Sequence, residues 1–422
     1  MIAMRNLNII AIQEGTPIPE DIVTKYHLTF ADLGKNAKLE RISSFCGVVR
    51  RGTSILVSLP KHYIDLSKFN QLSISDKLKH VRLILRVIIN YELNPAYSSF
   101  RRKDDLNTSF SFSSFFNIYD YFQNYGLHLK NRKNIEKGYS GKISWKDTMH
   151  KSQKIISAGN LVFLPFFVRH NVSDEDFITK CMIFAINYTE ELFSELLTLP
   201  DNSSIASRGV DRSLKENSKA VIFKLEMMRR EIFKDIDKKL LNDLIKFFRG
   251  INDNPHNVRD IKHYHFNNVW EKAVENYLND HFTGVQDDTL IFGTPKNKFH
   301  FKKMILENYN NASDHHHDTL QPDHYYFDGS QNTQYIFDSK YYNSISGLNH
   351  KQFVYHMILC NRAVNTYDAL IMPSENKTYT ETHLDLAIKY LPLKNQRVKI
   401  LLAHLNTQDV LEHFIEVGND IK

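Results

Sequence analysis

Two short apolar and aromatic runs near the C-terminus, residues 323–328 and 334–341, constrain the fold more than any other part of the sequence. The residues between them begin Asp-Gly-Ser-Gln-Asn, which favours a turn, so we predict that the two runs pair as a hairpin. Side chains alternate between the two faces of a strand, so Asp338 and Lys340 are expected on one face. Asp323 begins the partner strand and is expected across from Asp338.

The chain from about residue 256 onwards predicts helices and strands in the order of an α/β sandwich. A helix before the hairpin and a helix after it are expected to flank a mixed sheet. The predicted elements are a helix at 262–279, a strand near 289–293, the hairpin, a helix at 349–363, short strands at 367–372 and 398–404, and a helical C-terminus.

The first hundred residues predict a small mixed unit. Residues 45–49 and 55–59 read as strands joined by a turn in which Arg50 and Arg51 are exposed. Ser75 is expected to cap the helix that follows. The two arginines are expected either to form a solvated turn or to contact a partner or DNA.

The central region is expected to combine strands and helices. It contains predicted strands at 141–145 and 161–168, a helix at 174–197, and two helices within 217–250. We therefore predict a multidomain chain of mixed α+β or α/β class. Its predicted domains are an N-terminal mixed docking module at 1–100, a central strand and helical region at 101–255, and a C-terminal mixed-sheet domain at 256–422.

Composition says more about the cellular compartment of the protein than about its function. The formal charge of +6 is compatible with a phosphate-bearing partner but does not require one. Cys46, Cys181 and Cys360 are far apart, which predicts buried thiols in a reducing compartment rather than disulfides. The sequence shows neither a signal peptide nor an apolar run long enough to cross a bilayer. We expect a soluble, cytoplasmic protein without a membrane partner.

Two carboxylates that converge with one lysine match the needs of metal-assisted phosphodiester hydrolysis. The carboxylate oxygens of Asp323 and Asp338 are ligands that Mg²⁺ prefers, and the ion lowers the pKa of a bound water. Lys340 beside them is suited to orient that water or to stabilise developing charge. The alternative is an exposed hairpin with an ordinary Asp–Lys surface pair.

The two flanking helices offer accessory residues. Glu271 and Glu275 lie four residues apart beside an apolar stripe, and a nearby metal or lysine would relieve their repulsion. We predict Glu271 as an accessory acid and third metal ligand, with two solvated glutamates as the alternative. Gln352 in the following helix is predicted to bond a metal-bound water or a phosphate, or to be a polar residue on the helix flank.

Asp323 and Asp338-Ser-Lys340, with a glutamate-bearing helix before them and a Gln352-bearing helix after them, resemble the PD-(D/E)xK nuclease superfamily. That resemblance implies a mixed sheet flanked by helices, DNA cleavage, and dependence on Mg²⁺, for which Mn²⁺ would substitute. It also implies that the two acids are metal ligands and that Lys340 is the catalytic lysine.

Further short motifs resemble the LlaJI-type restriction endonucleases, which are relatives of McrC. They are Phe45-Cys-Gly-Val-Val, Leu59-Pro-Lys-His-Tyr63, Gly141-Lys-Ile-Ser-Trp145-Lys-Asp-Thr148 and Trp270-Glu-x-x-Val274. The resemblance implies a subunit of a bacterial restriction system for antiviral defence that cleaves double-stranded DNA. It also implies a separate McrB-like AAA+ GTPase motor, because this chain lacks the Gly-x-x-x-x-Gly-Lys-Ser/Thr loop. Residues 1 to about 250 are then expected to be the docking and regulatory part.

Three other functions remain open at this stage. The chain would be a non-catalytic structural or activating subunit if its nuclease fold were silent. It would act on RNA if the same ligands met an RNA backbone, because they contact phosphate rather than bases. The run Asp314-His-His-His-Asp318 would serve a histidine-metal enzyme, although a solvated loop is the favoured interpretation of His315, His316 and His317.

Overall fold

The structure is a computed structural model, and it forms two compact units. Unit 1 combines the N-terminal part of the chain, up to residue 110, with the C-terminal part from residue 256. Unit 2 consists of most of the residues between 111 and 255. The residues described are 7–94, 97, 105–108, 112–157, 159–193, 205, 207–252, 259–295, 299–306, 320–345, 347–390 and 397–420.

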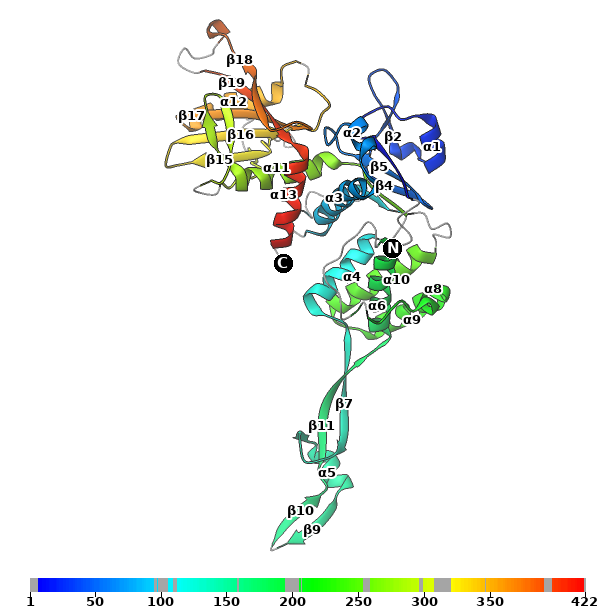
Figure 1. The fold of residues 1–422 in the computed structure, drawn as a ribbon. Helices are drawn as coiled ribbons and strands as arrows, with labels where there is room; N and C mark the ends of the chain where they lie inside the picture. The colour runs from blue at the N-terminus through cyan, green and yellow to red at the C-terminus, as the bar shows by residue number, and fades with distance from the viewer. Residues whose placement is uncertain are drawn as a thin grey trace, which may run out of the picture. The chain divides into compact units, whose positions relative to one another are not determined.

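The first sheet of unit 1 has the strand order β1-β5-β4-β12-β6. Strands β4 (Cys46–Arg51) and β5 (Ser54–Leu59) form the predicted antiparallel hairpin, and β1 (Asn8–Gln13) runs parallel to β5. Strand β12 (Arg259–His263) lies between β4 and β6 (Leu106–Thr108) and is antiparallel to both. Two parts of the chain that lie far apart in sequence therefore build one sheet (Figure 1).

Strand β12 corrects the predicted start of the helix at 262–279. Residues 262 and 263 belong to the strand, and the helix α11 runs over Phe266–His281. The strand lies so close to β4 that a Cβ atom on Gly47, whose φ is +140°, would approach the carbonyl oxygen of Ile261 to 2.0 Å. Glycine at position 47 is therefore required for this pairing.

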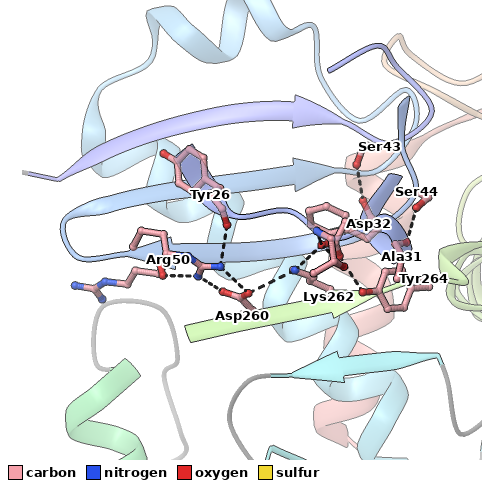
Figure 2. Close-up of polar contacts among 12 residues, drawn as sticks. Tyr26, Ala31, Asp32, Ser43, Ser44, Arg50, Asp260, Lys262 and Tyr264 are labelled. Atoms are coloured by element: carbon pink, nitrogen blue, oxygen red, sulfur yellow. Dashed lines mark hydrogen bonds and ion pairs between the residues drawn. The ribbon is translucent and has the colours of Figure 1, made fainter. Parts of the chain in front are cut away.

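Buried charges hold β12 in the sheet (Figure 2). Arg51 donates two hydrogen bonds to Asp260, and the ammonium of Lys262 lies 2.9 Å from Asp32. Tyr264 donates to the second oxygen of Asp32 at 2.9 Å. Arg51 thus differs from the exposed turn residue that the sequence predicts, since its ion pair lies inside unit 1.

Helix α3 (Ile74–Leu93) also belongs to this part of unit 1, and its cap differs from the prediction by two residues. The side chain of Ser73, not that of Ser75, accepts the hydrogen bond from the Asp76 amide. The shorter elements here are α1 (Glu20–Tyr26), η2 (Phe30–Asp32), β2 (Leu33–Lys35), β3 (Arg41–Ser43) and α2 (Leu66–Gln71).

The second sheet of unit 1 contains the predicted C-terminal hairpin, and its strand order is β15-β16-β17-β19-β18. Strands β16, β17 and β19 run parallel, while β15 and β18 are antiparallel edge strands. The bounds are β15 (His324–Asp328), β16 (Thr333–Ser339), β17 (Asn365–Ser374), β18 (Tyr379–Asp385) and β19 (Lys399–Asn406). The predicted hairpin is confirmed, whereas β18 has no counterpart among the predicted strands.

Helices pack against both faces of β16. Ile336 faces Tyr355 and Leu359 of α12 (His350–Leu359), which ends in the short helix η4 (Cys360–Arg362). Phe337 faces the opposite way and its ring contacts Phe282, the residue that follows α11. Neighbouring side chains of β16 point to opposite faces, and apolar residues stand on both sides because both faces are covered. The remaining elements are β13 (Phe282–Gln286), β14 (Thr289–Phe292), η5 (Ile388–Tyr390) and α13 (Thr407–Asp420).

Unit 2 consists of a helical bundle and a long β-ribbon, to which the short strand β8 (Lys142–Ile143) adds a third strand. The helices are α4 (Phe112–Tyr125), α6 (Phe177–Phe193), α8 (Arg212–Glu216), α9 (Ser218–Glu231) and α10 (Asp235–Asn252), and phenylalanine rings fill much of their core. The two predicted helices within 217–250 are confirmed. The predicted helix at 174–197 begins only at Phe177, because residues 174 and 175 belong to a strand.

The ribbon consists of β7 (Leu129–Lys137) and β11 (Phe167–Glu175), which pair over their full lengths (Figure 1). Between them lie β8 (Lys142–Ile143), α5 (Trp145–Lys151), β9 (Gln153–Ser157) and β10 (Asn160–Leu164). We call residues 129–175 the arm. Trp145 therefore begins a helix instead of ending a strand, and the predicted strand at 161–168 is divided between β10 and β11.

Both units are mixtures of helices and sheets, which confirms the α+β class at that coarse level. No helix among the described residues is long and apolar enough to cross a membrane. The run of three histidines at 315–317 and the basic residues at 101–103 lie outside the described residues.

Candidate active site

The hairpin brings Asp323 and Asp338 together at one end of the second sheet. His324 pairs with Phe337, so Asp323 lies one register step further on, opposite Asp338. The amide of Ser339 donates to Oδ2 of Asp323 at 3.1 Å. Only 9% of Asp323 and 1% of Asp338 is exposed, which is unusual for carboxylates without a compensating charge.

Lys340 supplies one compensating charge from the end of the same strand. Its amide donates to the carbonyl of Ile371 at 2.8 Å, and its ammonium forms an ion pair with Oδ2 of Asp338. Lys340 is 8% exposed. The two side chains meet because residues two apart on a strand face the same way. The structure therefore brings together the three residues that the sequence nominates first.

Glu271 reaches the same cluster from helix α11, through a lysine that sequence analysis missed. The ammonium of Lys303 lies 2.8 Å from Glu271 and 3.9 Å from Asp323. Its segment, residues 299–306, forms isolated bridges instead of a continuous strand, so neither helical nor strand periodicity marks it. Glu275 is instead paired with Lys272 at 3.0 Å.

Lys351 is a second missed lysine, in the first turn of α12. Its ammonium lies 3.7 Å from Oδ1 of Asp338. Burial disfavours the charged form of Lys351, but the combined attraction of Asp338, Tyr355 and Asp323 exceeds that penalty and raises the pKa of the ammonium. The available signal was its position directly before Gln352, the residue that the sequence analysis selected on this helix.

Two neighbouring carboxylates act on the carboxyl group of Asp323. Burial, and then the charges of Asp338 and Glu271, raise the pKa of Asp323 to about 8, against an ordinary value of 3.8. The carboxyl group of Asp323 is therefore protonated at neutral pH when lysines are the only cations near it. A pKa moved this far by burial together with specific neighbours is characteristic of functional sites.

The side-chain amide of Gln352 lies between helix α12 and the sheet. Its amide nitrogen donates to the carbonyl of Ile336 at 2.7 Å and to Asp368 at 3.1 Å, and the residue is fully buried. His356 is also bonded to Asp368, at 2.6 Å. The nitrogen of Gln352 therefore ties α12 to strands β16 and β17, and the bond of this residue to a metal-bound water or a phosphate stays a prediction.

The donor set fits a hard divalent cation. Both oxygens of Asp338 are buried and face the ammonium groups of Lys340 and Lys351 in the described part of the chain. That part contains no ready-made group of three acidic, histidine or cysteine ligands. Mg²⁺ does not need such a group, because one or two carboxylates commonly hold it and waters and substrate phosphates complete its shell.

Comparison with known proteins identifies the family to which the chain belongs. Residues 45–390 match the LlaJI restriction endonuclease family, and this match covers most of the chain. The chain therefore belongs to the LlaJI restriction endonuclease family. Membership confirms the predicted family and implies a nuclease of a restriction system.

Other comparisons add less. No match was found among curated proteins. The chain is similar to a chain of the solved half-complex from a tetradecameric assembly of Thermococcus gammatolerans McrB AAA+ hexamers with bound McrC. The identity is 12%, the alignment covers 98% of this chain and 100% of that chain, and the TM-score is 0.37. A score at this level does not establish a shared fold.

Proposed function

We propose that this chain is a Mg²⁺-dependent endodeoxyribonuclease that hydrolyses phosphodiester bonds of double-stranded DNA in a bacterial restriction system. The convergence of Asp323, Asp338 and Lys340 at the end of β16 carries the proposal. A mixed sheet with α11 and α12 packed on its two faces supports assignment of the C-terminal part to the PD-(D/E)xK nucleases.

The residues of the site have separable tasks in this proposal. Asp323 and Asp338 would hold the ion, with Glu271 reaching it directly or through a water. When bound, Mg²⁺ would lower the pKa of a water and neutralise charge on the scissile phosphate. Lys340 would then leave Asp338 to orient the water or the developing oxyanion. Lys303 would balance the charge of Glu271 when no ion is bound.

A silent nuclease fold is the less favoured alternative. A non-catalytic subunit would have no need to bury Asp323, Asp338 and Lys340 together, because burying charges is costly. The site would act on the phosphate backbone and not on the bases, so its residues do not distinguish DNA from RNA. A cleavage assay with both substrates distinguishes the two activities.

Cleavage is expected to require Mg²⁺ or Mn²⁺, and Ca²⁺ is expected to support DNA binding without turnover. Ca²⁺ shares the preference for oxygen ligands but is larger and geometrically looser. Nicking of supercoiled plasmid, with a matched RNA duplex as a second substrate, measures this. Full activity in EDTA would exclude the mechanism, and loss of activity on replacing His315, His316 and His317 with alanine would favour the histidine site.

We further propose that the arm docks onto a separate McrB-like AAA+ GTPase motor. The sequence contains no phosphate-binding loop of its own. Ile156 is 80% exposed and Tyr139 is 73% exposed, and Trp145 and Leu161 on the arm are also exposed. Ile156 and Leu161 are opposite one another in the β9–β10 hairpin, and exposed apolar side chains grouped in this way are typical of an interaction surface.

Charge introduced on the arm is therefore expected to weaken motor binding. Ile156→Asp combined with Leu161→Asp should lower the affinity by more than about tenfold. Affinity is measured by titrating labelled full-length chain with the motor subunit. Phe233→Asp is the matched control, because Phe233 is an equally exposed apolar residue of unit 2 outside the arm. Unchanged affinity in the arm variant, or an equal loss in the control, would contradict docking through the arm.

A further inference from the structure

The residue that follows Lys340 connects the candidate site to the first sheet of unit 1. The hydroxyl of Tyr341 donates to Oε2 of Glu14 at 2.7 Å and accepts from the amide of Lys61 at 2.9 Å. Cys46 donates to the same Glu14 oxygen at 2.9 Å. Tyr341 is buried, and burial together with Cys46 and Glu14 raises the pKa of its phenol, so the hydroxyl remains a proton donor.

The backbone around Tyr341 is held by the same region. The ammonium of Lys61 donates to the Tyr341 carbonyl at 3.0 Å and lies 4.8 Å from the centre of the Tyr341 ring. Asn343 donates to the Gly15 carbonyl at 3.2 Å, and the His62 ring bonds the Asn343 carbonyl at 3.0 Å. Residues just beyond the ends of β1 and β5 thus fix the chain that leaves β16.

The ring of Tyr341 also touches the helix that carries Glu271. It lies 5.8 Å from the ring of Phe266 and 6.4 Å from that of Trp270, both in α11. One side chain therefore contacts the first sheet and helix α11, and it is covalently adjacent to Lys340. Glu14 and Cys46 serve no step of the proposed hydrolysis.

We propose that Tyr341 is a positioning residue through which the first sheet of unit 1 sets the direction of the Lys340 side chain. This inference rests on the proposed function of Lys340. Lys340 lies just beyond the end of β16, where the hydrogen bond to Ile371 alone does not fix the rotation of the chain. Neighbouring side chains point to opposite faces, so anchoring the phenol of Tyr341 aims the ammonium of Lys340 at Asp338.

Tyr341→Phe is the direct test in the full-length chain. It removes the hydrogen bonds of the hydroxyl to Glu14, Lys61 and Cys46 but keeps the ring against α11. Loss of alignment should lower kcat for DNA cleavage by about 10- to 100-fold and leave KM for DNA unchanged. Tyr335→Phe is the matched control, because it removes a hydroxyl from β16 at a position facing Phe282 and is expected to preserve kcat.

A second measurement does not depend on cleavage. The rate at which a lysine-acetylating reagent modifies Lys340, read by mass spectrometry without DNA or metal, reports how well its ammonium is held. Tyr341→Phe and Glu14→Leu should each raise this rate several-fold. Glu14→Gln retains an acceptor oxygen, so it should be labelled at the rate of the unmodified chain. Wild-type labelling in both Tyr341→Phe and Glu14→Leu would overturn the inference. If the unmodified chain cleaved no DNA, the proposed function would fail, and labelling would still decide the positioning role.

Discussion

Lys340→Ala is expected to lower the rate of DNA cleavage by about 10²- to 10³-fold, the loss seen when one group that stabilises developing charge is removed. Asp338→Ala should lose cleavage to at least the same extent, because it removes a metal ligand. In both variants the loss is expected in kcat. Plasmid nicking under single-turnover conditions measures the effect.

The buried ion pair requires a stability control. Removing one partner of such a pair leaves an uncompensated charge and can cost about 3–5 kcal/mol. The double variant Asp338→Asn with Lys340→Met removes both charges together and should melt closer to the unmodified chain than either single variant. It should be equally inactive. A single variant that cleaves at the unmodified rate would remove that residue from the mechanism.

The second large effect is expected in the pH dependence of the stability of the fold, which bound Mg²⁺ should offset. Because the pKa of Asp323 is about 8 in the folded chain against an ordinary 3.8, the folded state keeps a proton that the unfolded state releases between these values. This carboxyl therefore stabilises the fold most below about pH 4, and the contribution is lost as the pH rises through about 8. A bound cation would take the place of that proton.

Thermal melting across a pH series tests the sign. The increase in Tm on adding Mg²⁺ should grow from about pH 6 to about pH 8, where proton and metal no longer compete. In Asp323→Asn the increase should be smaller and independent of pH in this window. A Mg²⁺ effect that shrinks as the pH rises would show that Asp323 is not the group that exchanges its proton for the metal.

Local chemistry explains which parts of the fold the sequence analysis predicted. The turn after β15 is closed by Asp328, whose Oδ1 accepts from the amide of Ser330 at 2.9 Å, a contact between residues two apart. The strands on either side are apolar because both faces of β16 are covered. Asp323, Asp338 and Lys340 were found because the hairpin itself brings them together.

The missed features depend on contacts between distant residues or on the absence of a core. Lys303 approaches Glu271 from a segment without periodicity, and Lys262 of β12 pairs with Asp32, which lies 230 residues earlier. The sequence of β7, Leu-Lys-Asn-Arg-Lys-Asn-Ile-Glu-Lys, shows no regular apolar alternation. A ribbon with no core to cover has no reason to alternate, so pattern analysis does not detect it.

The late position of β12 in the sequence has a consequence for biosynthesis. A ribosome must complete all of unit 2 before β12 fills its place between β4 and β6. Until then the nascent chain exposes the hydrogen-bonding edge of β4, and open edges invite aggregation. A truncated product that stops near residue 250 would keep that edge open, and a fragment that begins near residue 251 would carry β12 without its partners. A product that stops near residue 250 also lacks Tyr341, so the contacts of this residue with Glu14 and Lys61 form only after β16 has been translated.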